Sequence, residues 1–157
     1  MIIINRPPYF PMMIDLQGKP VLIVGGGKTA SRRAHTLLRC GAVIHAVSPD
    51  FSPDFPQDSH RLTRPFSPTD IHSSLALVIA ATNTRTVNRL VHDTAQALRI
   101  PVNVCDSQTE CDFFFPSLIN CDNVAASVCT AGLSPTLTRK LSDRLRKVWY
   151  SWVSEAR

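Results

Sequence analysis

Three consecutive glycines near the start of the chain, Gly25-Gly26-Gly27, have the spacing of a turn that binds phosphate. Four apolar residues precede them at 21–24, and apolar residues follow at helical spacing from Ala30 onward. This strand–turn–helix order is the context that the dinucleotide-binding fingerprint G-x-G-x-x-G/A requires. Gly25 permits the turn, Gly27 lets the backbone approach a pyrophosphate, and Ala30 allows helix and strand to pack closely. The sequence therefore predicts dinucleotide binding; the alternative is a tight turn without a ligand.

The other candidate binding residues follow predicted strands, because ligands of an open α/β sheet bind beyond the carboxyl ends of its strands. Asp50, about 20 residues past the fingerprint, is placed to accept a hydrogen bond from a ribose hydroxyl. Its alternative role is that of an exposed turn aspartate beside a proline. No arginine directly follows the second strand to bind a 2′-phosphate, so NAD is favoured over NADP. The expected cofactor site comprises Gly25, Gly26, Gly27, Lys28, Thr29, Ser48, Pro49, Asp50, Ala81 and Thr82.

Asp106 is the candidate catalytic residue. It directly follows the apolar segment 102–105, at the sheet edge where a ligand would bind, and partial burial there would favour its use as a general base. The alternative is an Asx turn that ends the strand. The five histidines are scattered without metal-ligand spacing, and no H-E-x-x-H, Walker loop or nucleophile elbow is present. We therefore expect no metal site and no histidine-based hydrolase.

Composition narrows the class of protein. The 157 residues suit one domain with a modest extension, and 44% of them are hydrophobic. No apolar run approaches the roughly 20 residues that cross a bilayer, and the run at 1–4 is too short for a signal peptide. Five cysteines without C-x-x-C indicate free thiols. The net charge of +5 permits a polyanionic ligand, but no aromatic-basic motif indicates nucleic acid. We expect a cytoplasmic protein that binds neither membrane nor nucleic acid.

Strands and helices alternate in the first two thirds of the chain, which predicts an α/β fold with a Rossmann-like parallel sheet and helices on both faces. The segment 75–81 is the most apolar and predicts a central strand that is buried on both faces. The other predicted strands are at 20–24, 43–47, 61–64 and 102–105, and the predicted helices run over 27–40 and from the cap at 82–84 to about residue 98.

After Asp106 the alternation stops. Segments 113–116 and 123–130 predict strands with no helix between them, as a short antiparallel extension of the sheet. Ser134-Pro135 then opens a long C-terminal helix. We divide the chain into a dinucleotide-binding domain at 1–112 and a strand extension with this helix at 113–157. The apolar stripe of the helix covers either its own sheet or, as we favour, a second subunit in a homodimer; it comprises Leu137, Leu141, Leu145, Val148 and Trp152.

The ordered motifs of the chain resemble those of the precorrin-2 dehydrogenase / sirohydrochlorin ferrochelatase family, the N-terminal domains of siroheme synthases. The resemblance covers nearly the whole chain, and the aspartate after Asn-Val-x and the late Gly-x-Ser-Pro are its specific features. The matching segments are Tyr9-Phe10-Pro11-Met12-Met13-Ile14-Asp15-Leu16, Val24-Gly25-Gly26-Gly27, Arg32-Arg33, Val47-Ser48-Pro49, Ile79-Ala80-Ala81-Thr82-Asn83, Asn103-Val104-Cys105-Asp106, Asp112-Phe113-Phe114-Phe115-Pro116-Ser117 and Gly132-Leu133-Ser134-Pro135.

The resemblance implies oxidation of the tetrapyrrole precorrin-2 to sirohydrochlorin with NAD as hydride acceptor, on the route to siroheme or cobalamin. Some family members also insert ferrous iron or cobalt. By position, Asp106 is the aspartate implicated in both reactions. Thr130 stands where relatives often carry serine, and the next residue, Ala131, adds a Cβ where relatives have glycine. Thr130 and Arg139 are the candidate substrate-binding residues. Arg139 belongs to a basic run, and the alternative interpretation of this run is a solvated helix face.

Longer family members continue into a helical substrate-binding region, which we expect this chain to lack. Its substrate pocket would then be minimal, or a partner subunit would complete it. Two other interpretations remain. A non-catalytic NAD-sensing regulatory domain explains the glycine turn equally well, but not Asn103-Val104-x-Asp106 together with the Phe-Phe-Phe-Pro-Ser segment. A tetrapyrrole carrier that has lost the use of NAD is disfavoured by the intact fingerprint.

Overall fold

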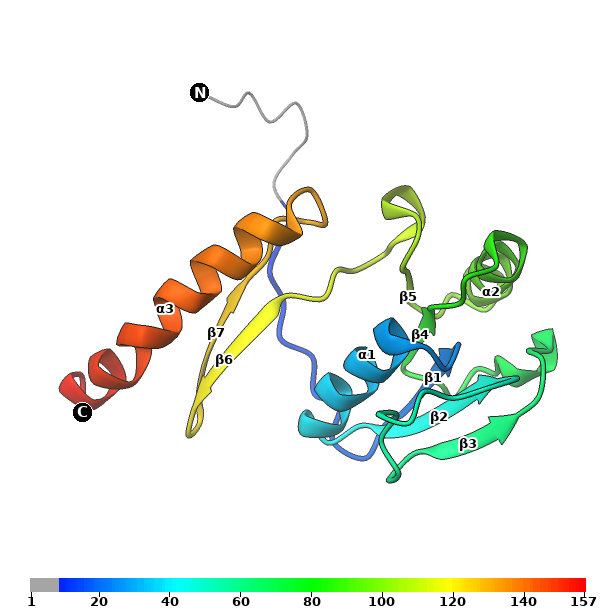
Figure 1. Cartoon of the computed structure of the whole chain (residues 1–157), viewed down its shortest axis with the longest axis horizontal. Coiled ribbons are helices and arrows are strands. Elements are labelled where there is room, and N and C mark those ends of the chain that lie inside the picture. The colour runs from blue at the N-terminus through cyan, green and yellow to red at the C-terminus, as the bar shows by residue number, and fades with distance from the viewer. Residues whose placement is uncertain (1–8) are drawn as a thin grey trace. The chain divides into compact units, whose positions relative to one another are not determined.

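The structure is a computed structural model that describes residues 9–157 (Figure 1). The chain forms two compact units. The larger unit is the continuous segment Met12–Phe113, and the smaller unit combines the N-terminal segment up to Pro11 with Phe114–Arg157. Within residues 9–157, no helix combines the length and the apolar character needed to cross a bilayer.

The larger unit is built on a parallel sheet of five strands in the order β3-β2-β1-β4-β5. The order reverses between β1 and β4, and this switch point is where open α/β sheets bind ligands. The strands are β1 (Pro20–Val24), β2 (Val43–Ser48), β3 (His60–Thr63), β4 (Leu77–Ala80) and β5 (Val102–Val104). All five were predicted from the sequence within one or two residues, including the fully buried β4 and the exposed edge strand β3.

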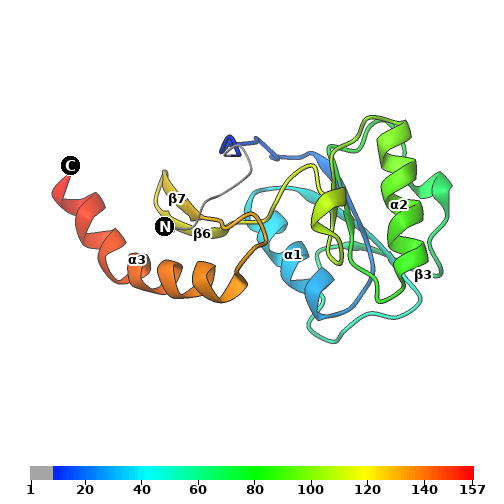
Figure 2. The same cartoon turned by 90° about the horizontal axis from the view of Figure 1, so that it is seen from above.

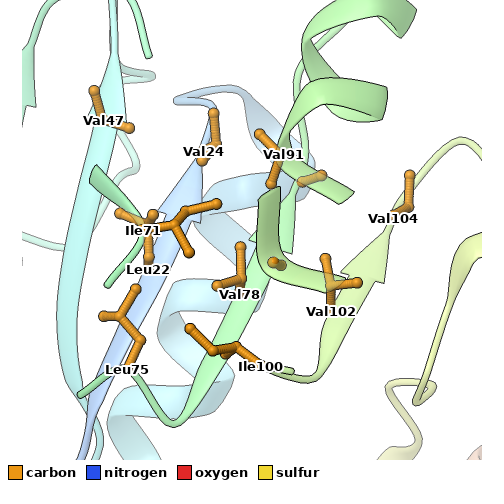
Figure 3. Close-up of a cluster of buried hydrophobic side chains, with 12 residues drawn as sticks. Leu22, Val24, Val47, Ile71, Leu75, Val78, Val91, Ile100, Val102 and Val104 are labelled. Carbon is orange, nitrogen blue, oxygen red and sulfur yellow. The ribbon is translucent and has the colours of Figure 1, made fainter. Parts of the chain in front are cut away.

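Helices α1 (Lys28–Arg39) and α2 (Arg85–Ala97) cover opposite faces of this sheet, as the sequence predicted. Alternate residues of each strand point to opposite faces. Leu22, Val24 and Val78 therefore join Val91 of α2 in one buried cluster (Figure 3). Their neighbours Ile23 and Ile79 point to the other face and are also fully buried. Figure 2 shows the two helices on either side of the strands.

Both helices of the larger unit end in the same hydrogen-bonded turn. At the end of α1, Gly41 N–H binds Leu38 O at 2.9 Å and Ala42 N–H binds Leu37 O at 3.1 Å. At the end of α2, Arg99 and Ile100 make the corresponding bonds to Gln96 and Ala95. This Schellman motif needs a left-handed residue after the cap. Gly41 has φ +79°, whereas at the equivalent place in α2 the residue is Arg99, with φ +56°.

The smaller unit contains a β-hairpin and one long helix. β6 (Ser117–Cys121) and β7 (Val124–Val128) pair antiparallel in a two-stranded sheet of their own. The prediction of a strand at 113–116 is therefore wrong: β6 begins one residue after Pro116, which has no N–H to donate to a ladder. The hairpin is also not an extension of the parallel sheet. Ser134 caps α3 (Pro135–Glu155) by accepting a bond from Leu137 N–H at 3.2 Å, as predicted.

The apolar stripe predicted for α3 is only partly buried within the smaller unit, since Leu145 and Val148 are half-buried and its other three residues are exposed. Helix α3 contacts β6 and β7, and its buried residues are Ser142 and Val153. Within the smaller unit, Leu137, Leu141 and Trp152 expose 47%, 43% and 55% of their surface. Three of the five stripe residues therefore remain available for another contact.

Candidate functional site

A cavity of about 600 Å³ opens at the carboxyl ends of β1, β2 and β4 in the larger unit. Three of the segments that line it each follow one of these strands: the glycine turn, the segment after β2 and the segment after β4. Nine of the ten residues predicted for a cofactor site lie on its surface; Thr29 does not. The nine are Gly25, Gly26, Gly27, Lys28, Ser48, Pro49, Asp50, Ala81 and Thr82.

Each glycine of the turn has a different steric role. Gly25 has φ +119°, and a Cβ there would lie 2.4 Å from Ala81 O. A Cβ at Gly26 would lie 2.0 Å from Asp50 O, so this glycine allows the first and second loops to touch. Gly27 has nothing within 4 Å of its Cβ position and lines the cavity. The open space is therefore at the glycine that the fingerprint assigns to the pyrophosphate.

The first turn of α1 provides the electrostatics that an anion needs. Gly27 is the N-cap, no side chain caps the helix, and no acidic residue lies in its first turn. The first N–H groups of a helix have no intrahelical acceptor, and they carry the positive end of the helix dipole. Lys28, at the first helical position, is exposed and lines the cavity. Phosphate oxygens are the natural acceptors for this set of donors.

Hydrogen bonds hold the segment after β2 against the glycine turn and α1. Ser52 N–H donates to Gly26 O at 2.8 Å. The hydroxyl of the buried Ser31 donates to Asp54 O at 2.8 Å. Asp50 is exposed, and its Oδ1 accepts a bond from Phe51 N–H at 2.9 Å. Asp50 thus bonds the backbone of its own loop and still lines the cavity, which is compatible with both roles that the sequence allows.

A buried asparagine fixes the segment after β4. Asn88 of α2 is fully buried, and its Oδ1 accepts bonds from Thr82 N–H at 3.1 Å and Thr82 Oγ1 at 2.7 Å. Its Nδ2 donates to Thr82 O at 3.0 Å. Because Thr82 lines the cavity, Asn88 sets the shape of this wall without reaching the cavity itself. Sequence reasoning missed Asn88, although its place between Val87 and Val91 on the buried face of a predicted helix was a visible signal.

Sequence reasoning also missed part of the cavity lining. Pro65 and Phe66 follow the edge strand β3, and Phe66 packs partly against the buried cluster. The remaining lining residues are Val24, Val47, Ser52, Asn83, Thr84 and Val87. The apolar Phe66 gave no polar signal in the sequence, and only the parallel pairing of β3 with β2 brings it to this edge.

Asp106 lies just beyond the end of β5, at the same edge of the sheet but outside the cavity lining. Its Oδ1 accepts a bond from Arg85 Nη1 at 3.3 Å, and 36% of its side chain is exposed. Arg85 also binds Glu110 through Nη2. The hydrogen bond to Glu110 raises the pKa of Arg85 above its usual value, and Asp106 adds a smaller effect in the same direction. Arg85 is thus held as a cation beside the candidate base.

The two predicted substrate residues lie in the smaller unit. Thr130 Oγ1 donates to Ser134 O at 3.1 Å, near the start of α3. Arg139 is 85% exposed and lies 3.9 Å from Asp143, one turn further along α3. Within residues 9–157, no group of three or more His, Cys, Asp or Glu side chains is arranged to hold a metal ion.

The residues present fit an NAD-type dinucleotide. An uncapped helix start, an open position over Gly27 and a cavity of about 600 Å³ suit a pyrophosphate with its two ribosyl groups. The glycine turn and Lys28 would hold the pyrophosphate. The segments after β2 and β4 would line the two ends of the molecule.

Comparisons with known proteins agree with this geometry. Residues 12–117 match the model of a family described as putative NAD(P)-binding. Siroheme synthase 2 of Aeromonas hydrophila subsp. hydrophila is 41% identical over 143 residues, which are 89% of this chain and 30% of that protein. The siroheme synthase of Zymomonas mobilis subsp. mobilis is 36% identical over 142 residues, which are 87% of this chain and 30% of that protein. The chain thus spans about a third of the length of these relatives.

A solved structure described as SirC, precorrin-2 dehydrogenase, has the same fold. Its TM-score is 0.75 at 24% identity, and the match covers 93% of this chain and 76% of that one. This likeness concerns the arrangement of strands and helices, including the hairpin and the terminal helix. The match over 12–117 leads to one conclusion: the chain belongs to this family of putative NAD(P)-binding domains, and the relatives to which it is similar are siroheme synthases, whose N-terminal domains its sequence motifs resemble.

Proposed function

We propose that this chain is an NAD-dependent dehydrogenase that oxidises precorrin-2 to sirohydrochlorin. The observation that carries the proposal is the place of Asp106. It follows β5 at the sheet edge where the glycine-lined cavity opens, and one of its oxygens is held by a cation. A carboxylate beside a dinucleotide site suits the removal of a proton from a substrate that also loses a hydride.

The proposed reaction removes two electrons and two protons from precorrin-2. Bound NAD⁺ supplies the acceptor for the hydride. The Asp106 carboxylate takes the remaining proton and becomes a carboxylic acid, which then releases that proton to solvent through its exposed side. The products are sirohydrochlorin, NADH and one proton, so atoms and charge balance. Lys28 and the glycine turn bind the cofactor throughout, and they take no part in the proton transfer.

The experiment is anaerobic incubation of the protein with precorrin-2 and NAD⁺, with NADH and sirohydrochlorin followed by absorbance. We expect NAD-dependent turnover. The variant Asp106→Asn should keep its affinity for NAD⁺, because Asp106 lies outside the cavity lining, and should lose about 100-fold or more in kcat, because removal of a general base costs about 10²–10⁴. NAD⁺ binding without turnover in the wild type would refute the dehydrogenase and favour a regulatory NAD sensor. Wild-type turnover by Asp106→Asn would refute the role of this residue.

Three finer proposals concern the rest of the chain. Thr130 and Arg139 would contact the substrate, whose many carboxylates suit a basic helix face. The exposed stripe of α3 would form a homodimer contact, which sedimentation of the purified protein tests directly. Asp106 would also accept pyrrole protons during insertion of ferrous iron or cobalt as a substrate. Incubation of sirohydrochlorin with either metal, followed by absorbance, tests this chelation, and unchanged spectra relative to a protein-free control would refute it.

A further inference from the structure

The geometry points to Arg85 as a positioning residue that orients the Asp106 carboxylate, with Glu110 as its anchor. This inference rests on the proposed function, because it concerns the base of that reaction. Arg85 is the first residue of α2 and directly follows Thr84, which lines the cavity. It was not among the residues selected from the sequence, where the first turn of a helix gave no reason to prefer it.

One guanidinium group holds both ends of the loop after β5. Arg85 Nη1 lies 3.3 Å from Asp106 Oδ1, and Nη2 binds Glu110 Oε1. The guanidinium is planar and rigid, so fixing one nitrogen on Glu110 also fixes the direction of the other. The side chain of Arg85 is 46% exposed, and its partner Glu110 is only 13% exposed. Glu110 is therefore the fixed end of this arrangement, and Asp106 is the end that Arg85 orients.

Glu110 is itself held in place. Its Oε1 also accepts a bond from Arg89 Nη1 at 3.3 Å, one turn further along α2. The loop backbone is fixed as well, because Val104 N–H donates to Cys111 Sγ at 3.2 Å and Ser107 N–H donates to Val104 O at 3.2 Å. Two helical cations and a closed loop thus determine where Glu110 lies.

The two oxygens of Asp106 are therefore not equivalent. Oδ1 accepts the bond from Arg85, and Oδ2 has no hydrogen-bond partner among residues 9–157. A carboxylate that is held through one oxygen presents the other in a fixed direction. We assign the proton-accepting role to Oδ2. In the absence of Arg85 the carboxyl group would rotate freely, and misplacement of a reacting group by about 1 Å costs roughly 100-fold in rate.

The test compares Arg85→Gln with Arg89→Gln. Both changes remove one positive charge and one contact with Glu110 from the same helix, but only Arg85 touches Asp106. We expect Arg85→Gln to lower kcat by about 10- to 100-fold, with KM for precorrin-2 and Kd for NAD⁺ changed less than about two-fold. Arg89→Gln removes one support of Glu110 but leaves the bonds of Arg85 to Glu110 and Asp106, so it should lower kcat by less than about three-fold. Arg85→Lys, which keeps the charge without the fork, should recover part of kcat.

A double variant separates orientation of Asp106 from a general structural effect. In the Asp106→Asn background, Arg85→Gln should not lower the residual turnover further, because the group that it orients is already gone. Equal kcat for Arg85→Gln and the wild type, or equal losses in Arg85→Gln and Arg89→Gln, would overturn the inference while the dehydrogenase stands. Should Arg85→Gln fail to fold, Glu110→Gln provides the same test through the anchor, with an expected fall in kcat and an unchanged Kd for NAD⁺. Absence of turnover in the wild type would overturn both the inference and the proposed function.

Discussion

Adding a single methyl group at Gly27 should weaken the binding of NAD⁺ and leave the stability of the protein nearly unchanged. Gly27 has φ −77° and ψ −176°, which any L-residue adopts, and its Cβ position is free of protein atoms within 4 Å. A Gly→Ala change at such a position stabilises a protein by about 0.4–1 kcal/mol, because the unfolded chain loses conformational freedom. Gly27 is also the N-cap of α1, where glycine is preferred over alanine by a similar amount, so the two effects should nearly cancel.

The same methyl group would occupy the space in which the pyrophosphate is expected. If it displaces one charge-assisted hydrogen bond to a helix N–H, the loss is about 1.5–3 kcal/mol. Since 1.4 kcal/mol is a factor of ten, Kd for NAD⁺ should rise by about 10- to 100-fold. Isothermal titration calorimetry gives Kd, and urea unfolding in the absence of NAD⁺ gives the free energy of unfolding.

Gly26→Ala is the matched control, because the neighbouring methyl group meets protein instead of open space. Its Cβ would lie 2.0 Å from Asp50 O and 2.9 Å from Phe51 Cα, both backbone atoms. Overpacking of this kind costs about 1–3 kcal/mol or more. The refuting result is an unchanged Kd in Gly27→Ala, which would mean that the pyrophosphate does not lie over this glycine. A loss of stability in Gly27→Ala as large as that in Gly26→Ala would refute the geometry of the turn.

Two further predictions concern stability. Arg99→Gly should raise the free energy of unfolding by about 1 kcal/mol and Tm by about 2–4 °C, because Arg99 has φ +56° in a turn that uses glycine at the end of α1; a lower Tm in calorimetry would contradict this account. Burial, and next the neighbouring His60 and His72, lower the pKa of His45 below 6.5, so on acidification the unfolded chain takes up this proton before the folded chain does. The contribution of neutral His45 to the free energy of unfolding is therefore fully present above about pH 6.5 and is lost as the pH falls further. When the pH is lowered from about 7.5 to 5.5, the Tm of His45→Gln should therefore fall less than that of the wild type. Equal losses in both proteins would show that His45 does not contribute.

The parallel sheet and the cofactor loops were predictable because they depend on local patterns. Short apolar runs bounded by glycine, proline and caps defined four of the five strands, all but the exposed edge strand β3, and the topological rule placed their following loops at one edge. The assignment of Gly25 to the turn and of Ala30 to close packing also agrees with the structure: Gly25 has φ +119°, and Ala30 is completely buried. The role of Gly26, which packs against Asp50 O, depends on a contact between two loops and was not visible in the fingerprint.

The features that sequence reasoning missed depend on contacts between distant residues. Asn88 looked like one polar position in a helix, and only its three bonds to Thr82 show that it shapes the cavity wall. Arg85 and Glu110 are separated by 25 positions, and folding brings them together beside Asp106. The three phenylalanines at 113–115 have high strand propensity but form no strand, because Pro116 interrupts the ladder and Asn103 Nδ2 binds Phe113 O at 2.8 Å.

The division of the chain into units has a consequence for synthesis on the ribosome. The larger unit is one continuous segment, Met12–Phe113, so all of its strands and both of its helices have been translated before the hairpin and α3 exist. The smaller unit joins the two ends of the chain, and the ring of Tyr9 meets that of Phe114 with their centroids 5.1 Å apart. Domains generally fold as they emerge. The nucleotide-binding unit can therefore fold first, while Tyr9, although translated earlier, has to wait for its partners until Phe114–Arg157 has been translated.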